Sequence, residues 1–175
     1  VMTTVSRFAG LPARRVKTAV DGCGVVEFAL PLWRMALAYR RFFGEAGPHS
    51  EVADRIWRAV AARPKYIAGD GMIGTELSRA TDGRILVKTG GAGVRVGFDA
   101  GSATAFAVKC ITGFVLPPTS ARPVRSDTAD VGLMAVMRNL GLLGAEELAA
   151  LEPFEKPPIL NAHGFPHGSV RVKLL

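Results

Sequence analysis

Three short apolar runs in the middle of the chain, separated by glycine-rich turns, constrain the fold more than any other feature. The runs cover residues 85–88, 94–100 and 103–110, and each has the length of a single strand. Residues 90–93 and 100–102 connect them, and connections this short join antiparallel neighbours. The sequence therefore predicts a three-stranded antiparallel meander.

Segments with helical periodicity lie on both sides of these strands. We expect Ser50, and Ser126 or Asp127, to cap two of the helices. The expected helices cover residues 2–9, 31–43, 51–63, 75–80, 127–140 and 144–151. Further short strands are expected over residues 15–20, 159–162 and 169–174, the last two around a turn at 164–168. Helices packed on an antiparallel sheet define an α+β fold.

Length and composition favour a single folded domain. The chain has 175 residues, 49% of them hydrophobic and 21% charged, which is enough for one core. It contains no repeat and no linker that would divide it. We therefore predict one domain over residues 1–175, with residues 117–125, polar and rich in proline, as a surface loop.

Charge, apolar patterning and cysteine usage argue against several kinds of partner. The formal net charge of +7 is scattered, without a basic stripe, so no nucleic-acid partner is expected. The most apolar stretch, residues 25–37, is interrupted by charges and a proline and is too short to span a membrane. Two cysteines without Cys-x-x-Cys spacing favour a reducing, cytoplasmic location.

The first candidate for chemistry is the segment Asp21-Gly22-Cys23-Gly24. A carboxylate and a thiol two residues apart on a glycine-rich turn can point into one pocket, where a thiolate binds zinc or acts as a nucleophile. The structural alternative is a buried cysteine beside an aspartate that caps its own turn. These four residues alone favour the structural alternative.

The second candidate is Lys88-Thr89-Gly90, at the end of an apolar run. Penicillin-recognising serine hydrolases carry the same tripeptide at a strand end, where the lysine supplies positive charge beside the nucleophile. The structural alternative is an exposed lysine followed by a turn. Those hydrolases also need Ser-x-x-Lys on a helix, and no serine of this chain is followed by lysine three residues later.

Further segments extend these two candidates into a longer pattern. The first part of the pattern is Asp21-Gly22-Cys23-Gly24-Val25, followed by Phe28-Ala29-Leu30-Pro31-Leu32. The second part is Ala68-Gly69-Asp70-Gly71 with Thr75-Glu76-Leu77. The third part is Val87-Lys88 with Gly90, Gly93, Val94 and Lys109. In this order they resemble the type II L-asparaginase family. That group includes the rhizobial inducible enzyme and is related to serine β-lactamases and glutaminases.

The resemblance implies a serine β-lactamase-like fold, usually as a homodimer. It implies an amidohydrolase that converts the asparagine side-chain amide to aspartate and ammonia. It also assigns roles to three residues: Cys23 as a zinc ligand, Asp21 as a support of that metal site or a substrate contact, and Lys88 as a catalytic lysine beside a serine. L-asparagine or a similar amide is the expected substrate.

The departures from the family pattern limit this expectation. The motifs run from about residue 8 to about 143 and again at the tail, which corresponds to the C-terminal half of such enzymes. The half that would hold the nucleophile and the other zinc ligands has no counterpart in the sequence. In addition, Met72, Gly74 and Ala92 replace residues usual in the family.

We therefore expect a partial asparaginase II-like amidohydrolase, truncated relative to the family and inactive or nearly so alone. Zinc is expected only if the missing N-terminal ligands are present, and the expected protein partner is a second copy or a missing N-terminal half. The alternative is a non-catalytic, truncated relative that binds a small molecule or serves in assembly.

Overall fold

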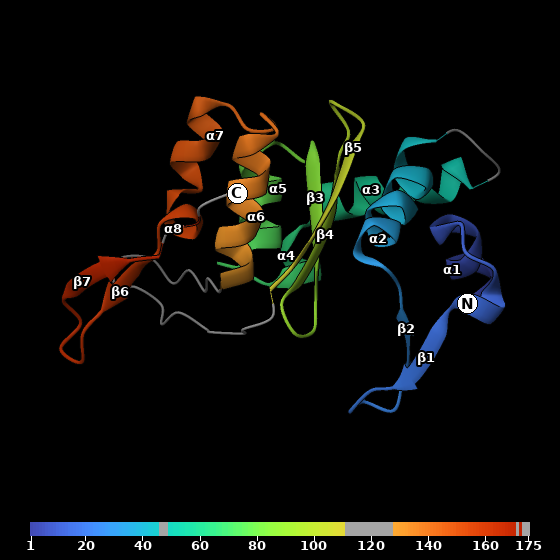
Figure 1. Ribbon diagram of the computed structural model, residues 1–175. Coiled ribbons are helices and arrows are strands. Elements are labelled where there is room, and N and C mark those ends of the chain that lie inside the picture. The colour runs from blue at the N-terminus through green and yellow to red at the C-terminus, as the bar shows by residue number, and fades with distance from the viewer. Residues whose placement is uncertain (46–48, 111–127, 171, 173–175) are drawn as a thin grey trace.

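The computed structural model describes residues 1–45, 49–110, 128–170 and 172 (Figure 1). The surface loop predicted at residues 117–125 and the caps predicted at Ser126 and Asp127 lie outside these residues. Helices and antiparallel strands alternate along the described chain, which confirms the α+β class.

The central sheet is the predicted meander. Strands β3 (Ile85–Gly90), β4 (Val94–Asp99) and β5 (Thr104–Lys109) are antiparallel, in the order β3-β4-β5. The β3–β4 turn is tight because Ala92 and Gly93 both adopt positive φ, at 50° and 74°. Side chains therefore alternate between two faces of a short, regular sheet.

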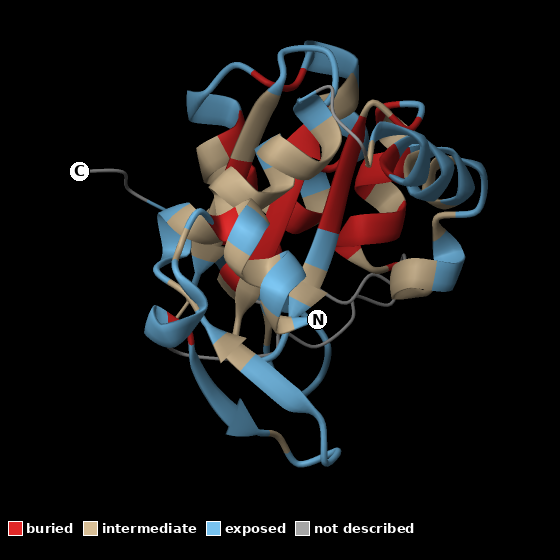
Figure 2. Ribbon diagram, turned by 90° about the vertical axis from the view of Figure 1, so that its right-hand side faces the viewer, coloured by how far each residue is buried: buried red, intermediate tan, exposed pale blue. Residues whose placement is uncertain are grey.

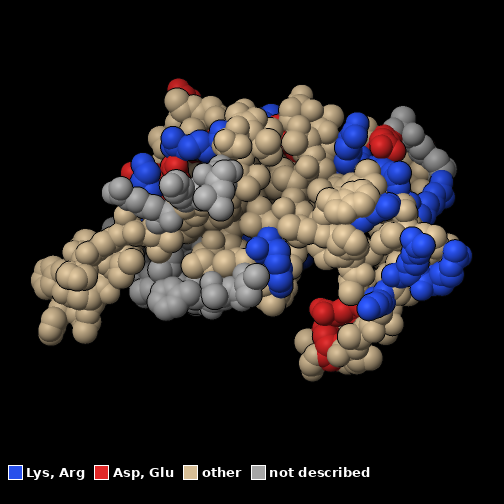
Figure 3. Space-filling view, in the orientation of Figure 1, with Lys and Arg blue, Asp and Glu red and all other residues tan. Residues whose placement is uncertain are grey.

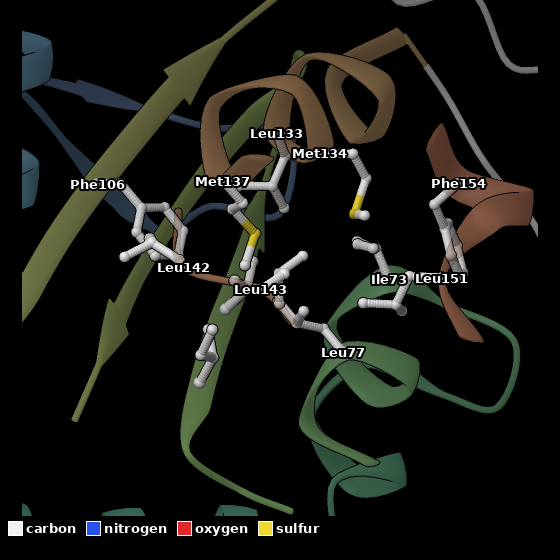
Figure 4. Close-up of a cluster of buried hydrophobic side chains, with 12 residues drawn as sticks. Ile73, Leu77, Phe106, Leu133, Met134, Met137, Leu142, Leu143, Leu151 and Phe154 are labelled. Carbon is white, nitrogen blue, oxygen red and sulfur yellow. The ribbon is translucent and has the colours of Figure 1, made fainter. Parts of the chain in front are cut away.

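One face of the sheet carries the main hydrophobic core (Figure 4). Helices α5 (Ile73–Ala80) and α6 (Thr128–Asn139) pack on this face, and the short helices α7 (Ala145–Ala150) and α8 (Glu152–Glu155) follow α6 in the chain. The core side chains are Ile73, Leu77, Ile85, Val87, Phe106, Leu133, Met134, Met137, Leu142, Leu143, Leu151 and Phe154. Ile85 and Val87 alternate with Leu86 and Lys88, so the latter two point to the opposite face.

The opposite face is covered by N-terminal helices. Helix α2 (Leu32–Tyr39), continued by a π-helical turn η2 (Arg40–Gly44), packs against β4 and β5, and α1 (Met2–Ala9) packs against α2. Helix α3 (Ser50–Ala62) packs against η2 and β3. Aromatic contacts fill this layer: the rings of Phe43, Trp57 and Phe98 lie within 6.2 Å of one another, centre to centre. No residue of α2 is fully buried, so this layer is more open than the core.

Two β-hairpins extend from the body of the molecule (Figure 1). One pairs β1 (Lys17–Val20) with β2 (Val26–Ala29), and the other pairs β6 (Pro158–Leu160) with β7 (Pro166–Ser169). Most of their residues are exposed, in contrast to the buried sheet (Figure 2). The first strand begins later than predicted because Ala13–Arg15 form a 3-10 turn.

The sequence missed three short elements and misplaced the start of two others. Strand β2 and the short helices α4 (Lys65–Ala68) and α8 were not predicted. Ser50 is the first residue of α3 rather than its cap, because His49 occupies the cap position without a side-chain hydrogen bond. Strand β7 begins at Pro166, inside the predicted turn, because the chain already reverses at residues 161–165. Residues 171, 173 and 174 of the strand predicted over 169–174 lie outside the described residues.

Candidate functional site

The first candidate segment forms the tip of the β1–β2 hairpin. The Oδ1 atom of Asp21 accepts hydrogen bonds from the backbone N–H groups of Cys23, at 2.9 Å, and Val25, at 2.8 Å. Gly24 completes the turn with a φ of 77°. Asp21 therefore shapes the turn, as the structural alternative predicted. The Cys23 thiol is exposed, however, so the predicted burial of this cysteine was wrong.

The second hairpin contains the same turn with a different acceptor. Oδ1 of Asn161 accepts hydrogen bonds from the backbone N–H groups of His163 and Phe165, both at 3.0 Å, and Gly164 has a φ of 83°. An uncharged amide oxygen thus holds this turn as a carboxylate oxygen holds the other. The geometry of the first turn therefore needs an acceptor at Asp21 but not a negative charge.

The hairpin tip does not make a zinc site on its own. A protein zinc site needs three or four ligands, usually thiolate, imidazole or carboxylate. Within the described ranges, no three His, Cys, Asp or Glu residues lie close enough to hold a metal ion. Cys23 and Asp21 offer one thiol and one carboxylate, and both backbone contacts of that carboxylate fall on one oxygen. The residues present do not fit a complete zinc site.

Lys88 stands at the exposed end of β3. Its Nζ donates a hydrogen bond to the backbone carbonyl of Thr89 at 2.7 Å. The register pairs Lys88 with Val96 and, through β4, places Lys109 on the same sheet face. The Nζ of Lys109 donates to the carbonyl of Ala92 at 2.6 Å. Lys88 therefore contacts the end of β3 itself, and Lys109, from the other outer strand, contacts the β3–β4 turn.

The two candidate segments do not touch each other. No hydrogen bond or ion pair joins Asp21 or Cys23 to Lys88, all three of which belong to the described part of the chain. Figure 3 shows acidic side chains on the β1–β2 hairpin, which stands clear of the body of the molecule.

The structure also contains an apolar groove that the sequence did not predict. It has a volume of about 410 Å³ and lies between α1 and α2 over the sheet. Leu30, which follows β2, and Val96, the cross-strand partner of Lys88, both line it. Met35 and Tyr39 of α2 both line the groove, and the packing of α1 against α2 leaves this face of α2 partly open.

One departure from the family pattern has a structural reason. A Cβ atom at Gly74 would lie 3.0 Å from the carbonyl oxygen of Val87, because α5 packs tightly on β3 at this point. A larger residue at position 74 would push the helix away from the sheet. Nothing in the structure explains Ala92, because its φ of 50° is unfavourable for alanine and glutamate alike.

These features define an α+β protein with a basic strand end and a separate carboxylate–thiol turn. A family model described as L-asparaginase II matches residues 1–172. The chain therefore belongs to the L-asparaginase II family. The match is wider than the interval from 8 to 143 that the motifs covered.

No curated protein matches the chain. Across the described residues, none of the helices combines the length and apolar character needed to cross a bilayer.

Proposed function

We propose that the chain takes part in hydrolysis of the asparagine side-chain amide to aspartate and ammonia. Membership of the L-asparaginase II family supports this. The observation that carries the proposal is the environment of the Lys88 ammonium group. Its ammonium group is exposed and contacts a main-chain carbonyl, and none of the described carboxylates pairs with it. Its positive charge is thus available to stabilise the oxygen that becomes negative during amide attack.

The nucleophile comes from outside this chain in our proposal. Activation of a serine needs a base within hydrogen-bond reach, and no Ser-x-x-Lys is present in the sequence. The chain alone is then inactive or nearly so. Cys23 and Asp21 contribute to a zinc site only when ligands from outside the chain complete it.

The β1–β2 hairpin is the surface through which we propose that a partner completes the site. Val20, Val25 and Val26 are 69%, 58% and 51% exposed there, next to Asp21 and Cys23. A two-stranded hairpin with exposed apolar side chains is marginally stable alone and gains stability when covered. The partner is an N-terminal half of the same fold or a second copy, in a reducing compartment where both cysteines stay reduced.

The test compares ammonia release from L-asparagine by two proteins. One is this chain, and the other is the chain extended by about 150 codons read in frame upstream of Val1 in its gene, which would restore a usual full-size domain. We expect that only the extended protein, and not the short chain, releases ammonia from L-asparagine. Turnover at equal rates by the short chain would show that it holds its own nucleophile.

Matched variants of the active form test each residue. Lys88→Met should lower kcat by about 100-fold or more, the effect of removing one oxyanion-stabilising group. Lys109→Met, at the same end of the sheet, should stay within about threefold of the parent. Cys23→Ala should remove bound zinc, measured by atomic absorption, and Cys110→Ala should retain it. Unchanged zinc content in Cys23→Ala would show that the ligand assignment is wrong.

The alternative is a non-catalytic relative that binds a small molecule or serves in assembly. The incomplete set of metal ligands within the described residues favours it. Under this alternative, the gene has no in-frame extension and the chain binds L-asparagine without releasing ammonia. Light scattering then decides between a binding monomer and an assembly module.

A further inference from the structure

A polar cavity lies between the C-terminal end of α3 and the C-terminal end of α5. Its volume of about 480 Å³ falls within the range of about 300–1,000 Å³ typical of ligand pockets. One wall is closely packed, because a Cβ atom at Gly83 would lie 2.6 Å from the Cβ of Ala61. Asp82 and Gly83 line the cavity just before β3 begins, so it adjoins the opposite end of this strand from Lys88.

A buried hydroxyl group without a hydrogen-bond partner belongs to the lining of this cavity. Ser78 of α5 is 2% exposed, and its Oγ atom has no partner among the described residues. Thr75 lies one turn earlier on the same face of the helix, and its Oγ1 donates to the carbonyl of Pro64 at 3.3 Å. Ser78 therefore faces the α3–α4 connection, as Thr75 does. Because a buried hydroxyl that makes no hydrogen bond is costly, a ligand that accepts one from it is favoured.

Two arginines line the cavity, and they differ in what already holds them. Arg79 is fully engaged, because its Nη2 lies 2.6 Å from Asp70 and its Nη1 lies 2.9 Å from Glu76. Arg63 donates through Nη1 to the carbonyl of Ala62 at 2.8 Å, and its other guanidinium N–H groups make no hydrogen bond with the described residues. Arg63 can therefore bind a carboxylate, whereas Arg79 is already neutralised.

Lys65 and Asp82 are charged lining residues that no described residue neutralises. The ammonium group of Lys65 makes no hydrogen bond or ion pair with the described residues, and it lies 5.4 Å from the centre of the Tyr66 ring. The carboxylate of Asp82 has no hydrogen bond or ion pair within the same part of the chain. Together with Arg63, the cavity thus offers a ligand two cations and one carboxylate.

We propose that this cavity binds an acidic α-amino acid of the size of L-aspartate. Such a ligand has two carboxylates and one ammonium group, which complement the charges of the cavity. Lys65 and Arg63 bind the carboxylates, and Asp82 accepts hydrogen bonds from the ammonium group. Ser78 donates to a carboxylate oxygen once rotation about its Cα–Cβ bond turns the hydroxyl to the cavity.

This site distinguishes the product of the reaction proposed above from its substrate. L-Asparagine has an uncharged amide in place of the second carboxylate of L-aspartate, so one of the two cations would lack its partner. Binding itself requires neither a nucleophile nor zinc, and it does not depend on the proposed reaction.

The experiment is calorimetric titration of the chain, at low ionic strength, with L-aspartate, L-asparagine and succinate. L-Asparagine lacks the second carboxylate, and succinate lacks the ammonium group. We expect L-aspartate to bind with a Kd below about 1 mM, and about tenfold more tightly than either of the other two compounds.

Matched variants test the charged contacts. Lys65→Met should weaken binding of L-aspartate by about tenfold. Lys17→Met removes an exposed lysine of β1 that lies outside the cavity and should bind like the parent. Asp82→Asn should abolish the preference for L-aspartate over succinate. Asparagine tolerates the φ of 49° at this position as aspartate does, so the backbone should not change.

Ser78→Ala separates a ligand contact from a structural role. It should weaken binding of L-aspartate by about threefold or more. Its midpoint of thermal unfolding should equal or exceed that of the parent, because the substitution removes a buried hydroxyl without a partner among the described residues. A clear fall in that midpoint would show that the hydroxyl serves the fold, and would count against the site.

Several results would overturn the proposal. These are the absence of L-aspartate binding, equal affinity for all three compounds, or full binding by both Lys65→Met and Asp82→Asn. Binding that is lost in Lys88→Met but retained in Lys65→Met would place the ligand at the other end of β3 and would also overturn it. Because these titrations measure no turnover, their failure leaves the ammonia assay unaffected, and the converse also holds.

Discussion

Gly97 of β4 lies at a position where any side chain would clash with neighbouring atoms. A Cβ atom there would lie 2.6 Å from the ring of Phe106 and 2.7 Å from the carbonyl oxygen of Leu86. We expect Gly97→Ala to lower the free energy of unfolding by about 2–3 kcal/mol, because the sheet must shift to admit a methyl group. Urea denaturation measures this. Gly22→Ala is the control, since a Cβ at Gly22 has no atom within 4 Å, and equal stability of the two variants would contradict the expectation.

Tyr39 makes a pH-dependent contribution to stability. Burial raises its pKa above the ordinary value of 10.0, so the unfolded chain loses this proton at a lower pH than the folded one. Its contribution is complete below pH 10 and is lost as the pH rises through the folded pKa. We therefore expect the parent to lose more stability than Tyr39→Phe between pH 9 and pH 12.

The chain has two tyrosines, so absorbance can isolate this group. In Tyr66→Phe, whose parent side chain is 80% exposed, the remaining tyrosinate absorbance at 295 nm should develop above pH 10 in the folded protein. Development of that signal at or below pH 10 would show that the Tyr39 ring is hydrated. Such hydration would also weaken the argument for an apolar groove.

Between elements, a buried ion pair joins the sheet to the helix on its core side. Nε of Arg95 in β4 lies 2.7 Å from Oδ1 of Asp130 in α6, and both side chains are at most 5% exposed. Removing one partner takes away the contact between two buried, opposite charges, so Asp130→Ala should destabilise the fold by about 3–5 kcal/mol.

The control for this pair is an exposed ion pair of the same chemistry. Asp70 lies 2.6 Å from Arg79, with the two side chains 69% and 46% exposed, and Asp70→Ala should cost less than about 1 kcal/mol. Thermal unfolding of both variants gives the comparison. Similar losses would mean that water reaches Arg95 and Asp130.

The sequence predicted the central elements because their signals are local. Alternating apolar residues and glycine turns predicted β3, β4 and β5, and helical spacing predicted α2, α3 and α6. Strand β2 was missed because it lies between a turn and Pro31 and buries no side chain fully. Its pairing depends on the side-chain acceptor of Asp21, a contact that periodicity does not reveal.

The candidate site, like the fold, was predicted only where its signals are local. Family-like motifs indicated Asp21, Cys23 and Lys88, but they could not show that the hairpin tip and the strand end stay apart. The apolar groove depends on how α1 packs against α2, two elements more than 20 residues apart in the chain. Such tertiary packing leaves no periodic signal in either segment. Only the assembled structure places Leu30 and Val96 along one wall.

Across the whole molecule, the two sides of the sheet are unequally buried. The side with α5 and α6 contains the continuous core, whereas α2 on the other side has no fully buried residue and the β1–β2 hairpin is exposed throughout most of its length. Local opening requires less free energy where few apolar contacts are lost. The N-terminal hairpin should therefore open without unfolding of the core.

Hydrogen exchange tests this expectation. Paired amides of β3 and β4 should exchange with the free energy of global unfolding, and those of β1 and β2 at least about 100-fold faster, through local opening. The β6–β7 hairpin, with a similar turn and similar exposure, serves as an internal comparison and should behave like β1–β2. Protection of β1–β2 that disappears on dilution would show that a second copy covers the hairpin. Protection equal to that of β3–β4 at every concentration would contradict the independence of the hairpin and show that the two sides of the sheet unfold together.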